Sequence, residues 1–216
     1  KGSCSKKKET EMEVLVPENF DLPHEAVTVQ NLTLRNNDTE VLLVHDKGDL
    51  LTSVKVRGKR SGYALPGGSI NSFTLQSTID QILKFLPVYR IDFLHFERLL
   101  DVEINMGPLI YLTSIREGIE ETGFLVKPVK VLLEESSSHS SSLLANTAPH
   151  KVVVVKTEIV AGEMQKRSVE TDDCDWFPLS ALPENIYWSH VERMRKIMPD
   201  TDIRVVEPEE VEENEE

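Results

Sequence analysis

The segment that most constrains this chain is REGIEETGF, residues 116–124. If it forms a helix ending at Gly123, then Glu117, Glu120 and Glu121 lie at i, i+3 and i+4, and their carboxylates project from one face of one turn. The last turn of a helix carries the negative end of the helix dipole, which costs each acid there about 0.3–1 kcal/mol. Three oxygen ligands at such a place are explained if a divalent cation such as Mg²⁺ binds among them. The plainer alternative is a solvated acidic helix face.

Two flanking features favour a binding site over a solvated face. Residues 65–68 read Leu-Pro-Gly-Gly, a turn whose glycines allow the backbone to approach a ligand closely. Gly123 stands where a left-handed helix cap is expected, and an apolar, strand-like run begins directly after it at Phe124. The helix itself has an apolar stripe with the spacing of a packed helix, made of Leu109, Leu112, Ile115 and Ile119.

A glycine-rich turn, an acidic helix and a glycine stop resemble the signature of the Nudix hydrolases, G-x5-E-x7-R-E-U-x-E-E-x-G-U, in which U is apolar. The second half matches at Arg116, Glu117, Glu120, Glu121, Gly123 and Phe124, while Gly118 stands where an apolar residue is usual. The first half is broken, because Pro108 occupies the position of the first signature Glu and the diglycine lies far upstream. An insertion of roughly residues 70–103 accounts for the split, and the resemblance then covers about residues 26–198.

A second stretch, late in the chain, strengthens the resemblance. Many Nudix proteins carry an acidic residue shortly before a Trp-Phe-x-Leu…Leu-Pro sequence, and here Trp176-Phe177-Pro178-Leu179 precedes Leu182-Pro183. Glu170 is the best positional match for that acid, which supplies a further metal ligand in some members. The alternatives are that Glu170 is a solvated loop acid and that the two aromatic residues belong to the core.

The resemblance implies a set of site residues. Mg²⁺ or Mn²⁺ ions would be held by Glu117, Glu120, Glu121 and a backbone carbonyl of Gly68, and the catalytic residues would be Arg116, Glu120, Glu121 and Glu170. The general base stays open among Glu134, Glu135 and Glu170. Four basic residues just ahead of the diglycine are candidates for neutralising substrate phosphates, of which we select Arg57 and Arg60 over Lys55 and Lys59. A solvated basic strand edge is the alternative for these side chains.

Composition limits the partners. The formal net charge is −13, of which seven glutamates in residues 207–216 contribute −7, and this excess of acid argues against a general nucleic-acid binder. A nucleotide-type small molecule is the expected substrate. No apolar run approaches the roughly 18 residues of a membrane span. Two cysteines, Cys4 and Cys174, form neither a disulfide framework nor a zinc-site spacing, so we expect a reducing compartment and a cytoplasmic protein.

The pattern of apolar residues alternates between strands and helices. Strands are expected at 26–34, 40–44, 51–56, 124–133 and 151–160, and helices at 109–122 and 183–198. This predicts a Nudix-like α/β/α sandwich with a mixed sheet. The predicted domain is 23–200, between a flexible segment 1–22 and an acidic disordered tail 201–216. Within the insert, residues 76–85 and 91–100 read as two short amphipathic helices separated at Pro87; they pad the domain, form a homodimer contact or, less favoured, cover the site as a lid.

The resulting expectation is a metal-dependent hydrolase that cleaves the diphosphate linkage of a nucleoside diphosphate joined to another moiety. The alternative is a Nudix-fold module that is catalytically weak or inactive and binds a nucleotide or a protein partner.

Overall fold

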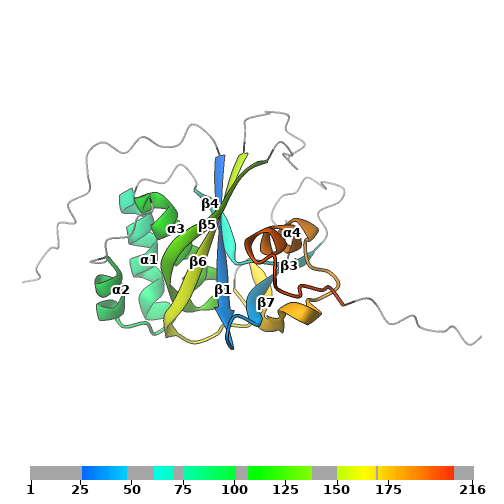
Figure 1. Cartoon of the computed structure of the whole chain (residues 1–216). Coiled ribbons are helices and arrows are strands. Elements are labelled where there is room, and N and C mark those ends of the chain that lie inside the picture. The colour runs from blue at the N-terminus through cyan, green and yellow to red at the C-terminus, as the bar shows by residue number, and fades with distance from the viewer. Residues whose placement is uncertain are drawn as a thin grey trace, which may run out of the picture.

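In the computed structural model, the described residues are 26–47, 61–70, 75–100, 107–137, 150–168 and 170–206, and in these ranges seven strands form one mixed sheet with helices on both faces (Figure 1). The elements in chain order are β1 (Ala26–Arg35), β2 (Glu40–Asp46), β3 (Gly62–Ala64), β4 (Gly67–Ile70), α1 (Leu75–Val88), α2 (Phe93–Leu100), α3 (Pro108–Thr122), β5 (Phe124–Ser137), β6 (His150–Gly162), β7 (Thr171–Pro178), the short 3₁₀ turn η1 (Leu179–Ala181) and α4 (Trp188–Ile197).

Strand β1 organises the sheet. It pairs in parallel with β6 along residues 26–33, and β6 pairs antiparallel with β5. On β1, residues 27–30 pair antiparallel with all four residues of β4, and the end of the strand pairs with β2. Strand β2 in turn lies beside β3 and β7. The diglycine therefore lies in a short strand attached to the centre of the sheet.

Two apolar cores lie on opposite faces of the sheet. Helices α1, α2 and α3 cover one face, where Ile82, Phe96, Ile115 and Ile119 pack on β-branched residues of β1 and β6. Helix α4 and η1 cover the other face, and their fully buried members are Leu179, Val191 and Met194. Figure 1 shows this division, with α1–α3 on one side of the strands and α4 on the other. The predicted α/β/α sandwich is confirmed.

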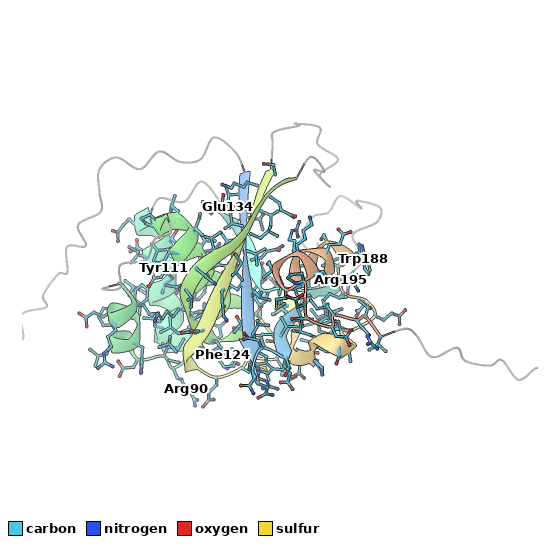
Figure 2. All side chains as sticks on the ribbon, viewed as in Figure 1. Arg90, Tyr111, Phe124, Glu134, Trp188 and Arg195 are labelled. Atoms are coloured by element: carbon cyan, nitrogen blue, oxygen red, sulfur yellow. The ribbon has the colours of Figure 1, made fainter. Side chains whose placement is uncertain are left out.

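Most predicted elements are present with small shifts at their ends. The β1, β2, β5 and β6 strands and the α3 helix match the expected ranges, whereas the terminal helix is shorter than predicted and runs from Trp188 to Ile197. At its first position, Trp188 has the helical spacing of a core residue, but 56% of it is exposed, and the Arg195 guanidinium lies over its ring at 5.1 Å (Figure 2). The folded part also continues past the predicted boundary at 200, because Ile203 is buried and the Arg204 N–H donates to the Leu179 carbonyl.

Other expectations fall outside the described residues. These are segment 1–22, the strand at 51–56 and the tail from 207 onward. None of the described helices has the length and apolar character of a membrane span.

The insert is part of the main core. Its two helices form as expected, and Pro87 lies inside the last turn of α1, one residue before the helix ends. The Tyr89 hydroxyl donates to the Glu120 carbonyl at 3.2 Å, and the Tyr111 hydroxyl of α3 donates to the Leu99 carbonyl of α2. Figure 2 shows Tyr111 on this helical side of the sheet. The insert therefore packs on the acidic helix, as its padding role requires, while homodimerisation stays a prediction.

Candidate active site

Helix α3 begins and ends where its sequence predicts. Pro108 occupies the first turn, where its missing N–H is not needed, and Gly123 caps the helix in the left-handed region at φ 77°. At Gly118, a Cβ would approach the Val126 Cγ2 atom to 2.7 Å, so glycine lets α3 lie against β5. Close packing on several sides explains why most of α3 is buried, including Arg116, Glu117 and Glu121, whereas Glu120 is half-buried.

The two halves of the split signature lie in contact. The Gly67 N–H donates to Glu121 Oε2 at 2.7 Å, and a Cβ at Gly68 would overlap the Glu117 carboxylate. Glycine is also required at position 67, where a Cβ would collide with the backbone of Val29. The spatial proximity expected of the diglycine and the acidic helix is therefore observed, despite the long insertion between them.

A buried amide locks α3 to this turn. Asn31 on β1 is 1% exposed, and its Nδ2 donates to the Ser114 carbonyl at 2.8 Å while its Oδ1 accepts from the Ser114 hydroxyl at 2.5 Å. The Asn31 backbone N–H donates to the Pro66 carbonyl at 2.7 Å. One residue thus fixes both the helix and the turn to the centre of the sheet, in a buried setting where an unmade hydrogen bond is costly.

Arg116 is the cation of the site. Its Nη1 donates to Glu120 Oε2 at 3.1 Å, its Nη2 contacts Glu117 Oε1, and Nη2 also lies 3.5 Å from the Ser69 carbonyl. The expected pairing of Arg116 with an acid is observed, and it engages two acids at once. Because the pairs are largely buried, they are held more firmly than a surface ion pair.

One guanidinium does not balance the negative charge. Burial raises the pKa of Glu117 to about 7, with Arg116 opposing the rise and Glu120 and Glu170 adding to it. Burial also raises the pKa of Glu120 and, well above its usual range, that of Glu121, where repulsion by Glu117 is the next cause. Glu170 raises the pKa of all three, which places its carboxylate within electrostatic reach of them.

The donors suit a hard divalent cation by type. Within the described ranges, no three histidine, cysteine or acidic side chains converge as a metal ligand group. In the structure, Arg116 engages Glu117 and Glu120, and the Glu121 carboxylate accepts from the Gly67 N–H. Carboxylate oxygens short of positive charge are nevertheless the ligands that Mg²⁺ and Mn²⁺ prefer. These residues fit such an ion in their chemistry.

Other candidates from the sequence lie away from this cluster or outside the described residues. Glu134 pairs with Lys151, and Glu135 accepts from Arg193 at 3.1 Å and from Lys196, so both acids have cations of their own. Arg57 and Arg60 are not among the described residues.

Sequence reasoning missed the residues that hold the turn. They are Asn31, Ser114 and His190, whose Nδ1 accepts the Leu65 N–H at 3.1 Å. Each lies far from its contact in the chain, so no local motif marks it.

No family model and no curated protein sequence matches this chain. Similar solved structures include a UDP-X diphosphatase (17% identity over 90% of this chain and 72% of that one, TM-score 0.48), a NUDIX hydrolase from Nitrosomonas europaea (12%, 86% and 79%, 0.46) and the NUDIX domain of Shewanella oneidensis NrtR complexed with ADP ribose (14%, 84% and 93%, 0.45). The chain is thus similar in structure to proteins of the family that its motif resembles. At such identities and scores the likeness does not extend to activity or substrate.

Proposed function

We propose that this chain is a Nudix-type pyrophosphohydrolase, which uses Mg²⁺ or Mn²⁺ to cleave the diphosphate linkage of a nucleoside diphosphate joined to another moiety. The observation that carries the proposal is the excess of buried negative charge beside the diglycine. Four carboxylates repel one another there, and Arg116 is the cation paired with them. Such an arrangement is unfavourable for the protein alone and becomes favourable when a divalent cation joins it.

The residues have separate roles in this proposal. Glu117, Glu120 and Glu121 hold the ion, and the backbone carbonyl of Gly68 is a further ligand. Arg116 orients Glu117 and Glu120 before and during binding. When bound, the ion polarises a phosphoryl oxygen and acidifies the attacking water. Gly67 orients the Glu121 carboxylate through its N–H.

Glu170 is our candidate for the general base. Of the three acids considered for this role, Glu134 and Glu135 are tied to lysine or arginine partners. Ion pairing lowers the pKa of Glu135, mainly through the hydrogen bond from Lys196, and so makes it a poorer proton acceptor. Glu170 is exposed and within electrostatic reach of the other carboxylates, a position that suits an acceptor for a proton from water at the site.

The test is release of phosphate-containing products from a panel of nucleoside triphosphates, ADP-ribose, dinucleoside polyphosphates and sugar nucleotides. Turnover should require Mg²⁺ or Mn²⁺ and should fall by about 10²-fold or more in Glu120→Gln and Glu121→Gln. Glu134→Gln is the matched control, because it removes an acid of the same type whose partner is Lys151, and it should keep activity. Metal-independent ligand binding without turnover across the panel would instead identify an inactive binding module.

A further inference from the structure

His190 lies in the first turn of α4, on the face of the sheet opposite α3. Its Nδ1 accepts the backbone N–H of Leu65 at 3.1 Å, and Leu65 is 2% exposed. This contact connects α4 to the chain two residues before Gly67. The helix that covers one face of the sheet therefore holds the segment that reaches the carboxylates on the other face.

Three consecutive residues of this segment each make a hydrogen bond to a different element of the fold. His190 accepts from Leu65, Asn31 donates to the Pro66 carbonyl, and Gly67 donates to Glu121. Because Pro66 has no N–H and Gly67 has no side chain, the segment offers few other groups by which it can be held. Its position relative to Glu121 then depends on these hydrogen bonds together with the pairing of β4 with β1, which begins at Gly67.

The His190 ring accepts the Leu65 N–H through Nδ1 in its neutral form. Burial, with a smaller contribution from Arg193, lowers the pKa of His190 to about 3. The ring is thus neutral in ordinary buffers, and Nδ1 keeps the lone pair that the Leu65 N–H needs. Because Nδ1 accepts, the ring proton lies on Nε2, which is 3.3 Å from Gln30 Nε2 and does not accept a hydrogen bond from that amide. The Gln30 carbonyl oxygen accepts from Arg193 at 3.4 Å.

We propose that His190 is a positioning residue for the reaction, acting through Leu65 to hold Gly67 against Glu121 and Gly68 beside Glu117. This inference rests on the proposed hydrolase function. Its physical basis is that a small displacement of the turn has two effects at once. It moves the backbone of Gly68, a proposed metal ligand, and it breaks the hydrogen bond from Gly67 to the Glu121 carboxylate. A displacement of about 1 Å in a catalytic constellation costs as much as 10²-fold in rate.

A matched pair of variants tests it. Asparagine and leucine have nearly the same shape, but only asparagine carries an acceptor where His190 has Nδ1. In His190→Leu, kcat should fall by roughly 10- to 100-fold, the Gly67 amide should exchange with solvent faster, and more Mg²⁺ should be needed for half-maximal activity. In His190→Asn, all three readouts should return toward the wild-type values.

Val191→Ala is the control for lost stability. Val191 is the next residue of α4 and fully buried in the same core as Leu65, so its truncation leaves a cavity there but keeps the hydrogen bond between Leu65 and His190. It should lower the melting temperature and leave kcat and the Mg²⁺ requirement unchanged. If His190→Leu fails to fold, His190→Gln takes its place. The glutamine amide lies farther from the backbone than Nδ1 and therefore leaves the Leu65 N–H without its acceptor.

The outcomes separate the two proposals. A wild-type chain with no turnover on any substrate refutes the hydrolase function. The exchange rate of the Gly67 amide still tests His190 in that case, because it should be faster in His190→Leu than in His190→Asn. Turnover that is equal in the Leu and Asn variants, with equal Gly67 exchange, overturns the positioning role alone.

Discussion

Replacing Glu117 by glutamine should stabilise the metal-free protein above pH 7, although glutamate is the residue that the proposed function requires there. The Glu117 carboxyl is buried, and its pKa rises from the ordinary value of 4.5 to about 7. Between these pH values the unfolded chain has released this proton and the native chain still holds it. Because the unfolded state binds fewer protons, the free energy of unfolding falls as pH rises through this window.

The magnitude follows from the size of the rise. Moving a pKa from 4.5 to about 7 corresponds to about 3 kcal/mol, since each tenfold change in proton affinity is worth about 1.36 kcal/mol. Wild type and Glu117→Gln should therefore differ little in this contribution at pH 4.5, and by up to about 3 kcal/mol at pH 8. The substitution also removes a charge that raises the pKa of Glu121, which adds to the gain.

Urea denaturation in EDTA, repeated from pH 4.5 to pH 8.5, measures the effect. Glu135→Gln is the matched control, because the pKa of Glu135 is lowered by its Lys196 and Arg193 partners, so its charge stabilises the native state. That variant should lose stability at pH 8, by about 1 kcal/mol or less for a pair of this exposure. Added Mg²⁺ should stabilise the wild type and leave Glu117→Gln nearly unchanged.

The opposite ordering would refute the reasoning. If Glu117→Gln is less stable than wild type at pH 8 in EDTA, then the Arg116 pair outweighs the burial and repulsion of the carboxylate. If the difference in the free energy of unfolding between the two proteins does not grow between pH 4.5 and pH 8, then protonation of Glu117 does not cause it.

Three further substitutions test the packing around the site. Gly68→Ala should reduce turnover by at least tenfold, because its Cβ overlaps the Glu117 carboxylate; the steady-state rate at saturating Mg²⁺ measures this. Gly118→Ala should cost about 1–3 kcal/mol in urea denaturation despite alanine's higher helix propensity, because its Cβ meets Val126. Ile82→Ala should cost about 2–5 kcal/mol in the same assay, because this insert residue is fully buried.

Each of these has a control nearby. A Cβ at Gly107 has nothing closer than Ile110 Cδ1 at 4.0 Å, so Gly107→Ala should be close to neutral in rate and stability. Leu83 is the neighbour of Ile82 and 36% exposed, so Leu83→Ala should cost clearly less. Equal costs at positions 82 and 83 would contradict the view that the insert belongs to the core.

The elements of the fold follow from local sequence patterns, and so does the acidic cluster. Apolar periodicity and glycine placement predicted β1, α3 and the Gly123 cap, since these depend on residues close together in the chain. The closeness of Gly68 to Glu117 followed only from the resemblance to a known signature. His190 and Asn31 escaped prediction because their partners lie 125 and 83 residues away, respectively. A buried hydrogen bond between such distant residues produces neither a periodic pattern of apolar residues nor a bias in composition by which the sequence could reveal it.

The partial failures have a physical pattern as well. Trp188 fits the helical spacing of buried residues, yet at the first position of α4 it is 56% exposed, and the Arg195 guanidinium lies over its ring. Ile203 was assigned to the tail because acidic residues dominate the C-terminal end of the sequence, but its burial and the hydrogen bonds of Arg204 to Leu179 and Leu182 dock the chain beside η1. At both positions, tertiary contacts at the end of an element determine whether the side chain is buried or exposed.

The split signature is tolerated because both sides of the insertion are fixed independently of it. Strand β4 is held by pairing with β1, and α3 is held by Asn31 and by the apolar core. The insert between them therefore needs only to connect the end of β4 to the start of α3. The entropy of closing a longer loop grows slowly, by about 0.6 kcal/mol for each doubling of length. Burial of Ile82 and Phe96 in the core and the Tyr89 bond to the Glu120 carbonyl exceed such a cost, at about 1.5–3 kcal/mol for each large apolar side chain. The insert thus adds support to the acidic helix, and the contact between the diglycine and the carboxylates keeps its geometry although its parts lie far apart in the sequence.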